Sequence, residues 1–128
     1  MIFSICVLSA PHLNQGNQTA LNTAKAVLAR GHQINRVFFY LDGVHTGSTL
    51  LTGHQDDENL QQQWVDLSNQ GDFELIVCVA AALRRGVVNE GEAQQNALPT
   101  ANLHPSFEIS GLGQWVEANM QADRVLTF

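Results

Sequence analysis

The residue most able to do chemistry in this chain is Cys78, which two arginines follow six and seven positions later. Residues 73–77 before it are rich in β-branched and large apolar side chains, and residues 79–85 are rich in alanine and are followed by Gly86. The first run predicts a buried strand and the second a short helix, so the thiol is expected at a strand–helix junction. Ligands in open α/β sheets bind at the carboxyl ends of strands, and a helix amino end favours a thiolate. The alternative is a cysteine that only fills the core, the common role of a free cysteine.

The spacing of Cys78 and Arg84 is C-x5-R, which is also the spacing of cysteine-dependent phosphatases. Those enzymes wrap a phosphate in a tight loop whose backbone N–H groups face the ligand, so the loop needs glycine or small polar residues. Here the intervening residues are valine, three alanines and leucine, which favour helix or strand and supply no hydroxyl. The spacing alone is a weak motif, and the sequence disfavours a phosphatase.

Acyl transfer by a Cys–His pair is a second alternative. The chain has five histidines: His12, His32, His45, His54 and His104. Loops could bring His12 or His45 near the thiol, but a surface or loop position is the favoured interpretation for each. The histidines lack metal-site spacing, so no metal is expected. The acidic run 56–58 is interpreted as the solvated start of a helix. The sequence contains no nucleotide-binding glycine motif, so no cofactor is predicted.

The two arginines, Arg84 and Arg85, have two interpretations. In the last turn of a short helix they complement its negative end, which stabilises by about 0.3–1 kcal/mol, and this is the favoured interpretation. Functionally, a cationic pair near a thiol could support it or attract an anionic partner surface. The second cysteine, Cys6, is predicted to be core. A thiol without a base, metal or cofactor suits sulfur exchange, in which a thiolate attacks the outer sulfur of a persulfide.

Composition indicates one globular domain over residues 1–128. The chain is 45% hydrophobic and 14% charged, with a net charge of −6 that disfavours a broad nucleic-acid-binding surface. Two distant cysteines without a CxxC motif favour a reducing compartment. No apolar run approaches the roughly 20 residues of a membrane helix, and the apolar start lacks the basic residues of a signal peptide.

Periodicity predicts strands alternating with helices, hence a doubly wound α/β fold with a mostly parallel sheet and helices on both faces. Strands are expected at 2–9, 34–40, 73–78 and 125–128, and helices at 17–30, 58–69, 79–85 and 89–96. Asn17 is expected to cap the first helix, and 41–57 to be an irregular loop. A last helix after Ser110 is expected to bury four side chains: Leu112, Trp115, Val116 and Met120.

Four stretches of the chain resemble the DsrE-like family of small sulfur-carrier proteins. They are Val37–Tyr40 with Asp42–Val44, Cys78–Val87, Ser110–Gly113, and the ending Asp123–Phe128. The stretch around the cysteine is the specific one. The resemblance implies that Cys78 carries a persulfide, which it receives from an upstream carrier similar to TusA and passes to a downstream carrier similar to TusE.

The resemblance also implies a pathway and an assembly. The pathway is 2-thiolation of the wobble uridine of tRNA in the cytoplasm, and dissimilatory sulfur oxidation is the alternative, because DsrE proteins of sulfur-oxidising bacteria share the cysteine stretch. The assembly is a dimer of heterotrimers with paralogous subunits similar to TusB and TusC. Direct contact with tRNA or a membrane is not expected. A third alternative is a non-catalytic scaffold subunit in which Cys78 is merely buried.

Overall fold

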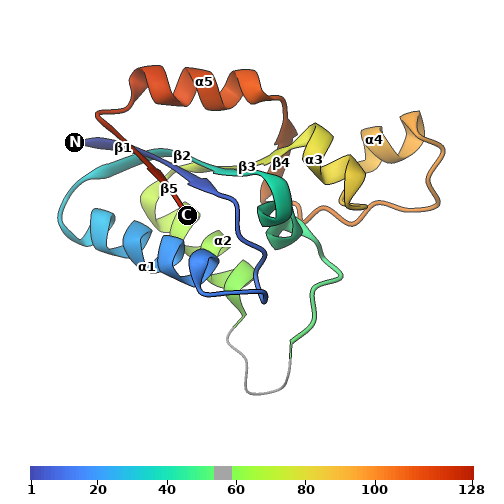
Figure 1. Ribbon diagram of the computed structural model, residues 1–128, viewed down its shortest axis with the longest axis horizontal. Helices are drawn as coiled ribbons and strands as arrows, with labels where there is room; N and C mark the ends of the chain where they lie inside the picture. The colour runs from blue at the N-terminus through green and yellow to red at the C-terminus, as the bar shows by residue number, and fades with distance from the viewer. Residues whose placement is uncertain (54–58) are drawn as a thin grey trace.

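The computed structural model describes residues 1–53 and 59–128, which form a three-layer α/β domain (Figure 1). Its central sheet has five strands in the order β4-β3-β2-β1-β5, and every neighbouring pair is parallel. The strands are β1 (Ile2–Val7), β2 (Gln33–Phe39), β3 (Glu74–Cys78), β4 (Phe107–Ser110) and β5 (Arg124–Thr127). The predicted doubly wound fold is therefore confirmed.

Helices cover both faces of the sheet, as expected. They are α1 (Gly16–Ala29), α2 (Leu60–Gly71), α3 (Val79–Arg84), α4 (Glu90–Gln95) and α5 (Leu112–Gln121), with a 3-10 helix, η1 (Leu41–Gly47), after β2. Successive strands from β1 to β4 are added in one direction, whereas β5 returns to the other side of β1. Right-handed crossovers then place α1 and α2 on one face and α5 on the other, while α3 and α4 extend beyond one end of the sheet (Figure 1).

The core has two halves because successive strand residues point to opposite faces. Phe38 faces α5, where its ring stacks on Trp115 with centroids 5.8 Å apart. Phe39 faces the other way, and its ring meets Trp64 of α2 edge-on at 5.5 Å. Both phenylalanines are fully buried, which explains the continuous apolar run in β2.

The prediction for the buried face of α5 was wrong for three of its four residues. Trp115 does pack against the core, but the exposed fractions of Leu112, Val116 and Met120 are 48%, 56% and 83%. The helix approaches the sheet through Ala118, which is 1% exposed and whose carbonyl accepts a hydrogen bond from the Ser4 hydroxyl at 3.0 Å. A small residue permits this close approach, and the apolar stripe at 112, 116 and 120 consequently faces outward.

Three other expectations need correction. β4 was not predicted, since its four residues are too few to show alternation. Part of the expected loop 41–57 is instead η1, and residues 54–58, which include the acidic run, lie outside the described residues. Asn17 is not a helix cap: it is fully buried inside α1, and its side-chain amide bonds Ser9, Thr46 and Trp64 instead.

The helix after the cysteine ends as predicted. Gly86 has φ +72°, a left-handed conformation that glycine adopts without strain, and α3 stops just before it. Asn89 then caps α4 by accepting a hydrogen bond from the backbone N–H of Glu92 at 2.8 Å. In the described part of the chain, no helix has the length and apolar character needed to cross a bilayer.

Candidate active site around Cys78

A cavity of about 250 Å³ lies where three neighbouring strands end. Its walls come from the residues that follow β2, from the end of β3 with the helix after it, and from the residues that follow β4. The lining residues are Tyr40, Leu41, Cys78, Val79, Ala80, Ala81, Arg84, Arg85, Gly111 and Leu112. The position agrees with the rule that open α/β sheets bind ligands beyond the carboxyl ends of their strands.

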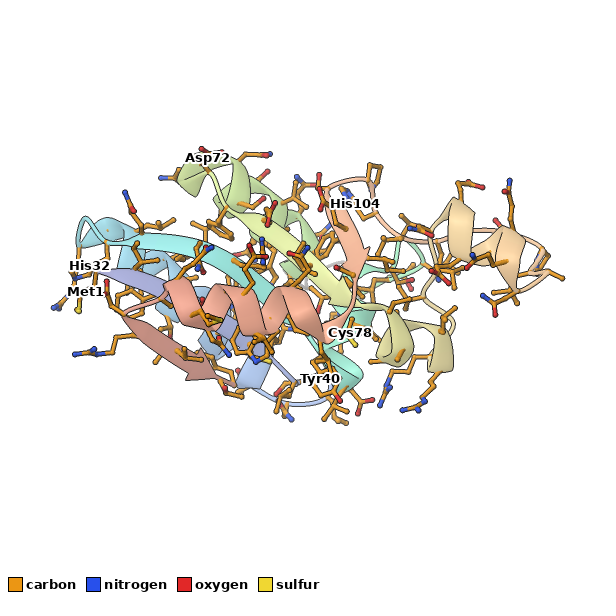
Figure 2. All side chains as sticks on the ribbon, turned by 90° about the horizontal axis from the view of Figure 1, so that it is seen from above. Met1, His32, Tyr40, Asp72, Cys78 and His104 are labelled. Atoms are coloured by element: carbon orange, nitrogen blue, oxygen red, sulfur yellow. The ribbon has the colours of Figure 1, made fainter. Side chains whose placement is uncertain are left out.

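Cys78 is the last residue of β3 and the residue that directly precedes α3, which confirms the predicted strand–helix junction. Figure 2 shows Cys78 where β3 passes into α3, with Tyr40 at the same end of the sheet. In β3 the cysteine is two residues after Ile76, which pairs in register with Phe38, so its side chain faces the α5 side. Cys78 is 2% exposed, and what opens onto the cavity is therefore a recessed thiol.

The wall formed after β2 depends on an unusual backbone. Leu41 has φ +50°, a left-handed conformation that costs a non-glycine residue on the order of 1–3 kcal/mol. The turn directs the chain into η1, where a Cβ on Gly43 would lie 2.0 Å from the carbonyl oxygen of Val7. Glycine at 43 therefore permits η1 to pack on the end of β1, and this packing holds Tyr40 and Leu41 beside the thiol.

The two arginines predicted as site residues have different surroundings. Arg85 donates from Nε to Asp42 Oδ1 at 2.7 Å and from a terminal nitrogen to the Ala81 carbonyl at 3.1 Å. This pairing joins α3 to η1 and neutralises the charge of Arg85. Arg84 is exposed, and it has no hydrogen bond or ion pair with the described residues. The structure thus separates a paired, positioning arginine from an unpaired one.

Cys6 lies in the core, as predicted, and is 5% exposed. Burial, together with the nearby charge of Cys78, raises the pKa of the Cys6 thiol to about 11. Cys6 pairs with Phe38, which pairs with Ile76, so β2 separates the two cysteines. Strand spacings of about 4.8 Å place their Cα atoms beyond the roughly 7 Å limit for a disulfide. Cys6 therefore remains a protonated core thiol at neutral pH.

None of the four histidines that the structure describes lines the cavity. His12 is exposed, His45 belongs to η1, and His104 lies against Phe107 with ring centroids 6.0 Å apart. His32 contacts the amino terminus at 3.1 Å, and His54 falls outside the described residues. Neither His12 nor His45 is thus brought to the thiol to form a Cys–His pair. Within residues 1–53 and 59–128, no group of three potential metal ligands is present.

The phosphatase alternative also fails on geometry. Residues 79–84, between the thiol and the end of the C-x5-R spacing, form α3 rather than a loop. Their backbone N–H groups follow the helix axis and do not encircle an anion. A recessed thiol beside apolar walls and arginines, without a general base from the described residues in the cavity, fits sulfur exchange better than acyl or phosphoryl transfer.

The whole chain, residues 1–128, matches the DsrE/DsrF-like family. The chain belongs to this family. Its relatives include a protein of Allochromatium vinosum, provisionally named as the sulfurtransferase DsrE, which is 48% identical over all of this chain and 98% of its own length. A Pseudomonas aeruginosa protein named as a homologue of the sulfurtransferase TusD is 44% identical over all of this chain and 97% of its own length. The TusD sulfurtransferase of Cronobacter sakazakii is 42% identical over the full length of both chains.

The fold has a solved counterpart. The ychN protein of E. coli superposes with a TM-score of 0.72, covering 99% of this chain and 97% of its own, at 24% identity. That likeness concerns the fold alone. The names of the DsrE/DsrF-like relatives support the activity class of a sulfurtransferase.

Sequence reasoning located the thiol but missed most of the walls around it. It did not assign Tyr40, Leu41 or Leu112 to the site, nor Asp42 as the partner of Arg85. One sequence feature could have predicted these residues: each group of lining residues directly follows a strand of the sheet. Had β4 been recognised, residues 111 and 112 would have been expected beside Cys78, since Cys78 pairs in register with Ser110.

Proposed function

We propose that Cys78 is the persulfide-carrying residue of a sulfurtransferase. The observation that carries the proposal is the recessed thiol in a cavity at the strand ends. Of the two cysteines, Cys78 lines this cavity, whereas Cys6 is held protonated in the core. Membership in a family whose relatives are named sulfurtransferases supports the same assignment.

The transfer is a sequence of two thiol exchanges. The Cys78 thiolate attacks the outer sulfur of a donor persulfide, R–S–SH, and a new S–S bond forms at Cys78. The donor's own S–S bond breaks, and its electron pair leaves with the donor thiolate. The thiolate of an acceptor then attacks the outer sulfur on Cys78 in the same manner. Each step conserves the number of S–S bonds, so no external oxidant or reductant is needed.

In this proposal the donor and the acceptor are carrier proteins similar to TusA and TusE, and the chain works beside paralogous subunits similar to TusB and TusC. The final product is the 2-thiouridine of the tRNA wobble position. Relatives named TusD, at 42–44% identity over the full chain, support this pathway. Two free cysteines fit a reducing compartment such as the cytoplasm.

Dissimilatory sulfur oxidation is the second candidate. It is favoured by the relative named DsrE, whose 48% identity exceeds that of the relatives named TusD. The two pathways differ in what a deletion removes. Loss of 2-thiouridine from bulk tRNA, measured by nucleoside mass spectrometry, would support tRNA thiolation. Normal 2-thiouridine together with impaired oxidation of stored sulfur would support the alternative.

The test of the transfer residue is mass spectrometry of the protein after incubation with a persulfide donor. We expect an adduct of about 32 Da, one sulfur atom, on the wild type and on Cys6→Ser, and none on Cys78→Ser. An adduct on Cys6 alone, or none on the wild type, would contradict the proposal and leave a scaffold role. Size-exclusion chromatography of the chain alone and with its paralogues tests the assembly, with a larger complex expected in the mixture.

A further inference from the structure

The electrostatic balance of the cavity is unlike that of the whole molecule. The chain carries a net charge of −6, with six basic residues in total. Two of these six, Arg84 and Arg85, line the cavity. Arg85 is paired with the carboxylate of Asp42, which is not among the lining residues. The cavity consequently retains one positive charge, that of Arg84, which has no partner among the described residues.

Arg84 is placed so that its side chain can contact a ligand whose sulfur lies at the thiol of Cys78. Arg84 lies six positions after Cys78, and a helical rise of 1.5 Å per residue makes that about 9 Å along α3. A long arginine side chain spans much of this distance, and both residues line the same cavity. An anionic group a few bonds from a sulfur could therefore contact Arg84 while the sulfur contacts Cys78.

The recess of the thiol limits what can deliver that sulfur. Cys78 is 2% exposed, so a sulfur on a flat, rigid protein surface does not reach it. The remaining walls are apolar or aromatic apart from the arginines, and the cavity of about 250 Å³ accepts a narrow group rather than a folded surface. The reacting sulfur must consequently be carried on a slender group.

Building on the proposed function, we infer that Arg84 selects sulfur donors that carry a carboxylate close to the persulfide. The carboxylate binds the guanidinium of Arg84, and this contact positions the outer sulfur for attack by Cys78. Arg85 is not the selecting residue, because its charge is bound to Asp42. A carboxylate close to a persulfide can belong to a small thiol or to an extended segment of a carrier protein.

The experiment compares three small donors that differ in charge: the persulfides of 3-mercaptopropionate, 2-mercaptoethanol and cysteamine. The rate of adduct formation on Cys78 is measured for each, and the preference is the ratio of the anionic to the neutral donor. We expect Arg84→Gln to lower this ratio by about threefold to fivefold, the size typical of one exposed ion pair. Arg84→Lys should largely retain it, because the charge remains.

A matched control is Arg30→Gln, which removes the same charge from the exposed end of α1 at the opposite end of the sheet. We expect it to leave the ratio unchanged. Iodoacetate and iodoacetamide, which differ in charge but little in size, provide a second comparison independent of persulfide chemistry. The iodoacetate preference of Cys78 should fall in Arg84→Gln as well.

The outcomes separate the inference from the function it builds on. If no donor modifies wild-type Cys78, the proposed function fails. If all donors modify it and Arg84→Gln leaves the charge ratio unchanged, this inference fails while the function stands. A persulfidated peptide with a carboxylate next to the cysteine provides the arm that separates the two sources. Faster reaction of this peptide than of the anionic small donor favours a carrier segment, and slower reaction favours a small thiol.

Discussion

At the scale of single residues, the two cysteines show how position decides reactivity. Cys6 and Cys78 are both nearly inaccessible, at 5% and 2% exposed. Cys6 is paired with a strand on each side, whereas Cys78 ends its strand where the sheet meets a cavity. Exposure alone does not distinguish them, but the cavity at Cys78 does.

Because the Cys6 thiol is buried, we expect the free energy of unfolding to fall at alkaline pH. Its folded-state pKa is raised to about 11 from 9.0, so the protonated thiol favours folding below pH 9. That contribution disappears as the pH rises from about 9 to about 11, and two units correspond to at most about 3 kcal/mol. Urea unfolding between pH 8 and 11 should therefore show a steeper decline for the wild type than for Cys6→Ala. Parallel declines in the two proteins would contradict the assignment.

At the scale of elements, η1 is the part that completes the cavity. It contacts α3 through the Arg85–Asp42 ion pair and packs on β1 at Gly43. It therefore fixes the distance between the wall after β2 and the helix that follows Cys78. Sequence patterns did not predict this segment, because the glycines and hydroxyl side chains in and around it are typical of a loop.

Gly43→Ala tests the packing of η1. An added Cβ would lie 2.0 Å from the Val7 carbonyl oxygen, so η1 must shift away from β1. We expect a loss of about 1–3 kcal/mol in the free energy of unfolding, as for overpacking, and slower adduct formation on Cys78. Gly113→Ala is the control, since nothing lies within 4 Å of its added Cβ and alanine favours a helix. Equal stability of Gly43→Ala and the wild type would show that the packing is not needed.

At the scale of the whole molecule, one buried polar network connects segments far apart in the sequence. The Asn17 amide nitrogen donates to the Ser9 carbonyl at 3.0 Å and to Thr46 Oγ1 at 2.8 Å. Its oxygen accepts a hydrogen bond from the indole N–H of Trp64 at 2.9 Å. The network joins α1, α2, η1 and the chain after β1, so it fixes the helices of one face against the end of the sheet.

Replacing Asn17 is expected to destabilise the entire domain. Asn17→Ala leaves the buried indole N–H of Trp64 and the Thr46 hydroxyl without these partners, at about 1–3 kcal/mol for an unsatisfied buried group. Chemical denaturation should show a loss of about 2–3 kcal/mol. Asn22→Ala on the exposed side of the same helix should change stability by less than about 0.5 kcal/mol. Similar losses in both variants would indicate a helix-propensity effect rather than the network.

Sequence patterns were sufficient to predict the α/β class, the order of most elements and the junction at Cys78. These features rest on local patterns: apolar runs in β1 to β3, the periodicity of α1 and α2, and the stop at Gly86. It failed for β4, which is too short to show alternation, and for α5, where Ala118 rather than Leu112 or Val116 meets the sheet.

The construction of the cavity and the pairing of the two arginines depend on contacts between segments that are distant in the sequence. The cavity combines residues after β2, β3 and β4, and Asp42 reaches Arg85 across 43 positions of sequence. The sequence pattern does not distinguish two adjacent arginines, because it contains no information on which of them a distant carboxylate contacts in the fold. Folding brings that carboxylate to Arg85 and leaves Arg84 free of a described partner beside the thiol.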